Sequence, residues 1–381
     1  MSKKILQILN SYAPAFKFGG GNKIMFEYAR LLNDKGGDIT VYTTDVKDDH
    51  SRLDNNEKSF YVQDLDIKYF YNYSTVLSSK YNITISPTLW WNILFKSKGY
   101  DYIHICEFRG VLPLLVLLVC KYRKIKLIHS GFGMLSSRPL KPWKENILLL
   151  YDLLISRRLI NNINTALCQS EREVLSYRKF GYIGECVIIP NYVGEKSGCI
   201  KYKNVFSKNE DINVIFIARI HPSKGVISAV KLIEQLNMFD YKYVLHIIGN
   251  DEGDLLNLTN YIKNNNLSEY VKYLGPIYGQ DRFSFYKDSD AIILLPGQDL
   301  STPLSFIEAL TENCFVIFNN NSYLEGGVAA MAGINVDEVD DIKNIHYMLS
   351  RKKYGSKPYE FYKEKLSTQV VENILVSKVF V

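Results

Sequence analysis

Short runs rich in β-branched and other apolar residues alternate with amphipathic stretches along most of this chain. The first pair is KILQIL at 4–9, which reads as a strand, and 22–34, whose apolar residues recur at helical spacing. Further predicted strands lie at 38–44, 102–106, 126–130, 165–170, 186–190, 212–219, 243–249, 270–275, 291–296 and 314–318. This alternation predicts an α/β fold of parallel sheets covered by helices on both faces.

The alternation is interrupted once, by a polar stretch at 191–211 with Gly, Ser and Lys and little periodicity. We therefore predict two domains of similar size, at 1–192 and 193–365. Residues 366–381 read as a terminal helix that can cross back to the first domain. Two doubly wound domains facing each other across a cleft would bring both sets of strand C-termini to that cleft, where open α/β sheets bind ligands.

The composition is that of an ordinary globular protein of 381 residues, long enough for two cores. A net charge of +6 weakly favours anionic partners and does not imply nucleic acid. None of the six cysteines lies in a CxxC pair, which favours free thiols in a reducing compartment over zinc ligands or disulfides. The N-terminus lacks a signal peptide's apolar region, and the longest apolar run, 111–120, is too short to span a bilayer. We therefore expect a cytoplasmic protein.

The first strand–helix connection of the second half, ARIHPSKGV, carries two cations. Arg219 falls at the predicted end of the strand and Lys224 at the start of the next helix. Two cations at the carboxyl edge of a sheet, beside a helix N-terminus, suit a diphosphate. An ordinary surface turn with solvated charges would have a similar sequence.

The stretch DLSTPLSFIEAL, at 299–310, predicts a second helix start at the same edge. Ser301 and Thr302 are good N-caps, and Pro303 suits the first helical position. Glu308 then lies one turn after Leu304, on the apolar face. A phosphate at the helix N-terminus and a ribose bonded to Glu308 would explain this arrangement. A structural glutamate paired with a buried base is the alternative.

Together these motifs resemble the retaining, two-domain nucleotide-sugar glycosyltransferases of family 4, whose patterns are GRL-x-x-x-KG and E-x7-E. The resemblance covers nearly the whole chain: KGGDITVYTTD, IIPNYV, HIIGNDEG, VKYLGPI and YKDSDAIILLP follow in the expected order. It implies the GT-B fold, with two Rossmann-like domains, an acceptor site in the first and a donor site in the second.

The resemblance also implies roles for individual residues. Arg219 and Lys224 would neutralise the diphosphate, His104 in the first domain would contact the donor sugar, and His129 is a weaker candidate for the acceptor side. The other implied donor-binding positions are the glycine loop Gly19, Gly20 and Gly21, the ribose ligand Glu308, the phosphate-binding backbone near Pro303 and Leu304, and the further positions Asp299 and Ile277.

One position departs from the family pattern. The first glutamate of E-x7-E corresponds here to Leu300. Its contact with the transferred sugar is therefore in doubt, although Asp299, one residue earlier, could substitute for it. A catalytically inactive relative stays open as an alternative.

We expect neither a metal ion nor another cofactor beyond the donor, with UDP-sugar favoured over GDP-sugar. DxD triplets occur at Asp64–Asp66 and Asp288–Asp290, but the first lies in a strand-like run and the second at an acidic helix end. Both read as solvated or capping aspartates.

A basic stretch at 121–144 contains no acidic residue and includes Trp143. Its cations are Lys121, Arg123, Lys124, Lys126, Arg138, Lys141 and Lys144. This is either a solvated face or a surface that touches anionic lipid at the inner face of a membrane.

The sequence thus predicts a metal-independent, hexosyltransferase-like enzyme that moves sugar from a nucleoside diphosphate to a glycan or lipid-linked acceptor, for surface polysaccharide or another glycoconjugate. A nucleotide-sugar epimerase of the same fold and a non-catalytic nucleotide-sugar-binding subunit are the alternatives. The base, sugar, acceptor, linkage and oligomeric state are not fixed by the sequence.

Overall fold

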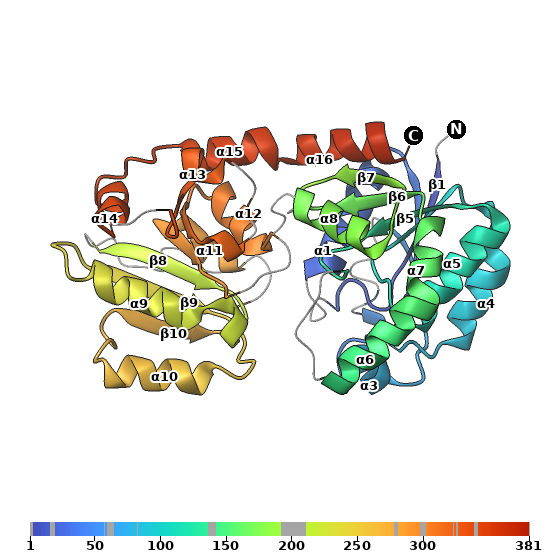
Figure 1. Cartoon of the computed structure of the whole chain (residues 1–381), viewed down its shortest axis with the longest axis horizontal. Coiled ribbons are helices and arrows are strands. Elements are labelled where there is room, and N and C mark those ends of the chain that lie inside the picture. Colours follow the sequence, from blue (N-terminus) through green and yellow to red (C-terminus); the bar gives the residue numbers. More distant parts are fainter. Residues whose placement is uncertain are drawn as a thin grey trace. The chain divides into compact units, whose positions relative to one another are not determined.

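The computed structural model describes residues 3–15, 20–56, 58, 65–81, 83–135, 142–191, 211–277, 281–297, 302–322, 324, 327–338 and 342–380. They form two compact units (Figure 1). The first comprises Met1–Pro190 together with Val371–Val381, and the second comprises Asn191–Val370. Most of the predicted linker, 192–210, lies outside the described residues.

The first unit contains a seven-stranded parallel sheet in the order β3-β2-β1-β4-β5-β6-β7. The strands are β1 Lys4–Ile8, β2 Asp38–Thr44, β3 Asp66–Phe70, β4 Tyr102–Ile105, β5 Lys126–Ser130, β6 Thr165–Cys168 and β7 Glu185–Ile188. Its helices are α1 Gly20–Asp34, α3 Thr75–Tyr81, α4 Pro87–Lys96, α5 Val111–Arg123, α6 Pro142–Tyr151, α7 Arg157–Leu159 and α8 Glu171–Phe180. The strand order reverses between β1 and β4, which makes their carboxyl ends this sheet's switch point.

The second unit contains a six-stranded parallel sheet in the order β10-β9-β8-β11-β12-β13. The strands are β8 Ile212–Ile217, β9 Tyr243–Ile248, β10 Val271–Gly275, β11 Ala291–Leu294, β12 Phe315–Phe318 and β13 Gly333–Asn335. Its helices are α9 Val226–Leu236, α10 Leu255–Asn264, α11 Arg282–Lys287, α12 Leu304–Thr311, α13 Val328–Met331, α14 Ile342–Ser350 and α15 Lys357–Lys365. Here the order reverses between β8 and β11.

Both faces of the second sheet are buried, which explains why its strands read as continuous apolar runs. Val214 and Phe216 of β8 belong to a core shared with α9, α10 and α14. Ile215, between them, belongs to a second core shared with α11, α12 and α15. Successive side chains of a strand point to opposite faces, so one strand serves both cores.

The end of the chain belongs to the first unit. Helix α16, Thr368–Ile374, continues as a π-helical turn at Leu375–Val379. Glu372 forms an ion pair at 2.8 Å with Lys35, the residue after α1, and the ring of Phe380 packs edge-on against Tyr102 of β4. In the part of the chain that the structure describes, we find no helix with the length and apolar character needed to cross a bilayer.

Candidate functional site

The two motifs that the sequence singles out in the second half meet at the β8/β11 switch point. The turn after β8 and the loop after β11 are bonded directly, since the Gly297 N–H donates to the Ser223 carbonyl at 3.0 Å. Gly225 has φ +73°, and a Cβ there would lie 1.8 Å from the carbonyl oxygen of Leu295. Glycine is thus the residue that lets these two loops pack together at the expected ligand edge.

Arg219 and Lys224 both follow β8 at this edge, as predicted. Lys224 ends a 3-10 turn, Pro222–Lys224, in which the His221 side chain accepts a hydrogen bond from the Ser223 N–H at 3.2 Å. The guanidinium of Arg219 is more than half exposed and pairs with Glu252 at 2.5 Å. An anion that binds Arg219 therefore competes with Glu252, a residue that the sequence interpretation missed although it lies in the HIIGNDEG motif.

The loop after β9 packs onto the same edge. A Cβ on Gly249 would lie 1.8 Å from the carbonyl oxygen of Ala218, so this glycine allows the β8 and β9 ends to approach closely. The Ile220 N–H then donates to the Asn250 carbonyl at 2.7 Å. The backbone on either side of Arg219 is therefore fixed by its neighbours.

Helix α12 begins one residue later than predicted. Pro303 is not its first residue but its N-cap, because an extended backbone with ψ 140° keeps it outside the helix. The N-cap predicted at Thr302 was therefore one residue too early, and Ser301 lies outside the described residues. The Asn191 side chain holds the Thr302 carbonyl at 2.6 Å and so fixes the entry to the helix.

Glu308 of α12 is fully buried, and two residues of α11 contact its carboxylate. The guanidinium of Arg282 bonds to one oxygen, and the Tyr286 hydroxyl donates to the other at 3.1 Å. This is the pairing with a buried base that the sequence left open as the alternative.

Two further predicted donor residues lie near Glu308. Ile277 and Leu304 are partly buried and pack against the apolar cluster that includes Phe306 and Ile307. The sequence interpretation missed Arg282 and Tyr286, although their spacing of four in RFSFYK places them on one face of a helix.

Two of the three glycines in the predicted glycine loop belong to a helix. Gly19 lies outside the described residues, as do Asp299 and Leu300. Gly20 and Gly21 instead form the first turn of α1, so the helix starts two residues before the predicted 22. A Cβ on Gly21 would lie 3.0 Å from the ring of Phe132, which explains this glycine by packing inside the first unit.

His104 does not reach the ligand edge of the first sheet in this structure. It is fully buried, and its ring contacts those of Tyr28 and Phe380. Its Nε2 bonds to the Ser130 hydroxyl at 2.8 Å, and burial lowers its pKa to about 3. This placement is that of a neutral core histidine and gives no support to a contact with sugar.

His129, the acceptor-side candidate, is buried in the same way. Its Nδ1 lies 2.5 Å from the Tyr177 hydroxyl, and burial lowers its pKa to about 3.

Glu107 is the ionisable residue that lies at the β1/β4 switch point, and the sequence interpretation did not select it. It follows β4 by two residues, and one carboxylate oxygen accepts the Asn10 N–H at 3.1 Å. Asn10 is itself held by the hydroxyls of Ser78 and Thr84, at 2.8 and 2.5 Å. Burial raises the pKa of Glu107 to about 7, against the opposing effect of the Asn10 N–H.

The DxD aspartates that the structure describes have structural partners. Asp66 accepts a hydrogen bond from Thr40 at 3.1 Å, and Asp290 pairs with Lys352 at 3.0 Å; Asp64 lies outside the described residues. Within the described ranges no group of three or more His, Cys, Asp or Glu side chains could hold a metal ion.

The cations of the basic stretch 121–144 whose side chains the structure describes all lie before β5 or at its start. Lys121 and Arg123 end α5, Lys124 is the C-cap of that helix and Lys126 starts β5, so these cations lie at the amino edge of the sheet. Residues 136–141 and the side chains of 142–145 are outside the described part.

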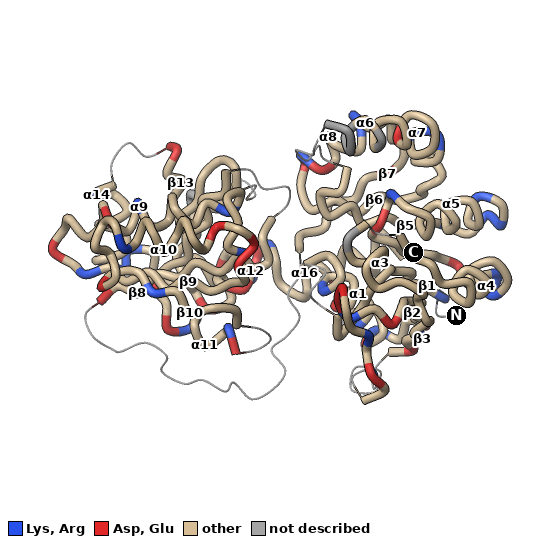
Figure 2. Tube along the Cα trace, turned by 90° about the horizontal axis from the view of Figure 1, so that it is seen from below, with Lys and Arg blue, Asp and Glu red and all other residues tan. Residues whose placement is uncertain are grey.

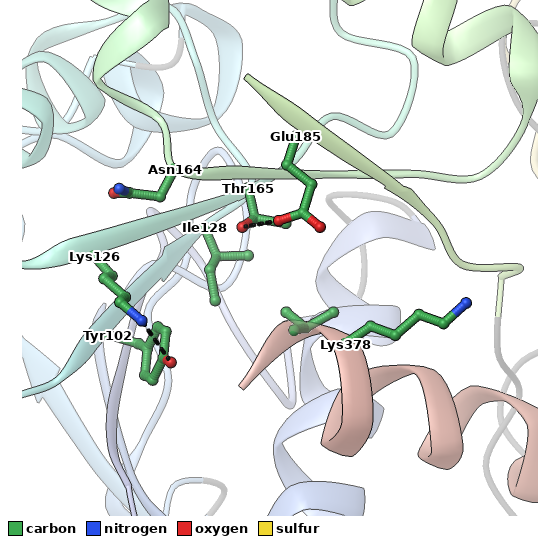
Figure 3. A pocket seen from close by; sticks show the side chains of 8 residues that line it. Tyr102, Lys126, Ile128, Asn164, Thr165, Glu185 and Lys378 are labelled. Atoms are coloured by element: carbon green, nitrogen blue, oxygen red, sulfur yellow. Dashed lines mark hydrogen bonds between the residues drawn. The ribbon is translucent and has the colours of Figure 1, made fainter. Parts of the chain in front are cut away.

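A shallow hollow lies at the amino edge of the first sheet (Figure 3). Tyr102, Lys126, Thr165 and Glu185 line it from the first residues of β4 to β7. Their polar groups pair with one another: Lys126 with the Tyr102 hydroxyl, and Thr165 with Glu185, both at 3.4 Å. Because it lies at the edge opposite the switch point, this hollow is not the predicted ligand site.

The sequence of the second unit is similar to that of a known family. Residues 200–344 match the sequence model of the family described as glycosyl transferases group 1. No curated protein matches the chain in sequence.

Solved structures match the fold over almost the whole chain. HepE from Anabaena in complex with UDP-glucose is 16% identical, with 99% of both chains covered and a TM-score of 0.68. Sucrose-phosphate synthase from Thermosynechococcus elongatus is 13% identical, with 98% of both chains covered and a TM-score of 0.69. A glycosyltransferase from Rickettsia africae is 17% identical, covering 99% of this chain and 97% of that one, with a TM-score of 0.67. The chain thus has the GT-B fold of two Rossmann-like domains, as the resemblance implied.

Proposed function

We propose that this chain, whose residues 200–344 match the sequence model of the glycosyl transferases group 1, is a retaining glycosyltransferase that uses a nucleoside-diphosphate sugar. The observation that carries the proposal is the meeting of the Arg219–Lys224 turn with the loop before α12, at the switch point of the second sheet. UDP and UDP-glucose are bound by the structurally similar HepE, which favours a UDP-sugar here.

The proposed donor site has three parts. Arg219 and Lys224 stabilise the diphosphate as it leaves, and the amino end of α12 binds a phosphate oxygen. Glu308 accepts hydrogen bonds from the ribose hydroxyls while it remains bonded to Arg282 and Tyr286. Because these groups already supply positive potential, we propose metal-independent transfer, which should survive excess EDTA.

The proposed acceptor is a glycan or a lipid-linked sugar, bound by the first unit, in the synthesis of a surface polysaccharide or other glycoconjugate. A lipid-linked acceptor would place the enzyme at the inner face of an anionic membrane. Exposed basic and apolar residues of α4 and α5 in the first unit support this location.

A thermal-shift screen with UDP-, GDP- and ADP-sugars tests the donor site first. We expect stabilisation by a UDP-sugar, and loss of that stabilisation in Arg219→Ala and Lys224→Ala. With acceptor present, each variant should transfer sugar at least about 100-fold more slowly, the effect of losing one preorganised electrostatic partner. An isomerised sugar would indicate an epimerase, and donor binding without any turnover would indicate a binding subunit.

A further inference from the structure

Helices α4 and α5 of the first unit expose apolar side chains that a covered helix would bury. On α4, Trp91 is 59% exposed and Phe95 is 57% exposed, and their ring centroids lie 4.1 Å apart. On α5, Tyr122 is 89% exposed and Leu118 is 48% exposed. The opposite sides of the helices supply the core of the unit, so each helix is apolar on two sides.

The two exposed stripes form one surface. The helices pack side by side, and the Arg123 guanidinium at the end of α5 bonds to the Leu94 carbonyl and, at 3.3 Å, to the Ser97 hydroxyl. Basic residues lie at the C-terminal ends of both helices (Figure 2). We call this surface the α4–α5 face; it consists of Trp91, Leu94, Phe95, Leu118 and Tyr122 with the exposed lysines Lys96, Lys98, Lys121 and Lys124.

The charge of the α4–α5 face is of one sign. The sequence contains no Asp or Glu between 67 and 100, nor between 108 and 144. Asp101 lies between these ranges, and its carboxylate accepts the Lys4 N–H at 2.8 Å. The exposed aromatic rings therefore lie beside four lysines that no acid on either helix can neutralise.

We propose that the α4–α5 face docks the protein onto an anionic membrane. Aromatic and leucine side chains beside lysines are the residues of helices that lie in a lipid interface, where each cation near the surface adds attraction. A protein partner fits less well, because lysine is depleted at protein–protein interfaces. The inference deepens the proposed function by giving access to a lipid-linked acceptor, but it does not depend on transfer chemistry.

Sedimentation of the full chain with vesicles tests the docking. The parent should bind vesicles of phosphatidylcholine and phosphatidylglycerol in equal parts, bind phosphatidylcholine vesicles weakly, and dissociate as salt rises. Replacing Lys96, Lys98, Lys121 and Lys124 with serine should lower the partition coefficient by at least about 100-fold, since each cation contributes several-fold. Replacing Trp91, Phe95 and Tyr122 with serine should lower it on both kinds of vesicle.

Matched control variants separate binding by the α4–α5 face from the effects of total charge and total exposed apolar surface. The charge control removes four exposed lysines outside the face by substituting serine for Lys179, Lys263, Lys272 and Lys287. The apolar control removes exposed apolar side chains outside the face by substituting serine for Ile183, Met238 and Leu256. Both control variants should bind vesicles as the parent does. Equal losses in face and control variants, or no binding by the parent, would overturn the docking proposal. Donor-induced thermal shifts are measured without vesicles, so either proposal can fail while the other stands.

Discussion

The carboxylate of Glu308 is positioned by two neighbours, the guanidinium of Arg282 and the hydroxyl of Tyr286. These two contacts are enough to explain why the acid can be buried, because a buried carboxylate is tolerated when it is paired and hydrogen-bonded. Neutralising it leaves Arg282 partly buried without a counter-charge, so a loss of stability is expected whether or not Glu308 also binds ribose. Melting temperature by itself therefore cannot reveal its role.

The affinity difference between UDP and 2′-deoxy-UDP does separate the two roles. In the parent, removing the 2′-hydroxyl should weaken binding by about 1–3 kcal/mol, the scale of a hydrogen bond to a charged group. In Glu308→Gln this difference should shrink, because the acceptor has lost its charge. Tyr286→Phe is the control: it removes a contact to Glu308 and should leave the difference intact. An undiminished difference in Glu308→Gln would make Glu308 a purely structural residue.

Glu107 gives the first unit a predictable pH dependence. Its pKa is raised to about 7, so between its unfolded value near 4.5 and pH 7 the folded protein binds more protons than the unfolded chain. The free energy of unfolding due to this group should therefore fall by roughly 3 kcal/mol as pH rises through that window. The parent minus Glu107→Gln difference, measured by urea unfolding at pH 5 and pH 8, isolates this slope.

Glu173→Gln is a control variant for that measurement. Glu173 is also buried, but its two oxygens accept the N–H groups of Gly133 and Gln169 at 2.7 and 2.8 Å. Glu173→Gln should cost stability at both pH values. If Glu107→Gln shows the same pH slope as the parent, the carboxyl of Glu107 is ionised normally despite its burial.

Sequence reasoning selected Arg219, Lys224 and Glu308 because motif chemistry is local, but it could not show which side chains are buried. His104 lies on the strand face that packs against Tyr28 of α1 and Phe380 of the C-terminal segment, and neither contact can be read from YIHIC. Glu107, three residues later, lies beyond the strand end, where the chain reaches the ligand edge.

At the scale of elements, the close approach of two loops forms the proposed donor site. The sequence alternation predicted nearly every strand, because parallel strands are apolar throughout. It did not single out α4, whose apolar residues occur on both sides of the helix and so lack a clear period. Nor could it show that Gly225 lies against Leu295, since that contact joins loops seventy residues apart.

Gly225→Ala should therefore strain the backbone and also distort the proposed donor site. A left-handed conformation costs alanine about 1–2 kcal/mol, and the new methyl group would also collide with the Leu295 carbonyl. Gly253→Ala is the control, because its φ is +105° but nothing lies within 4 Å of the added carbon. Both variants should unfold at lower urea concentration, but only Gly225→Ala should weaken UDP binding in calorimetry. Equal affinities would mean that the Lys224 turn is not held by this contact.

At the scale of the whole molecule, the chain begins and ends in the same unit. The predicted terminal helix was correct in sequence position, but only the contacts show that Val371–Val381 completes the first core. Val371, Leu375, Val379 and Phe380 are all buried there, while residues up to Val370 belong to the second unit. The stability of the first unit should therefore depend on residues that follow the second unit in sequence.

Truncation after Val370 should destabilise the first unit selectively. Each buried side chain that is lost removes about 1.5–3 kcal/mol of hydrophobic stabilisation, and four of them together approach the net stability of a typical domain. Hydrogen exchange should show lost protection in β4, where the rings of Tyr102 and His104 contact Phe380, and retained protection in β8 and β9. Phe380→Ala should show the same pattern at smaller amplitude, near 3–5 kcal/mol. Lost protection confined to β8 and β9 would mean instead that the C-terminal segment stabilises the second unit, and the division of the chain at Val370 would be wrong.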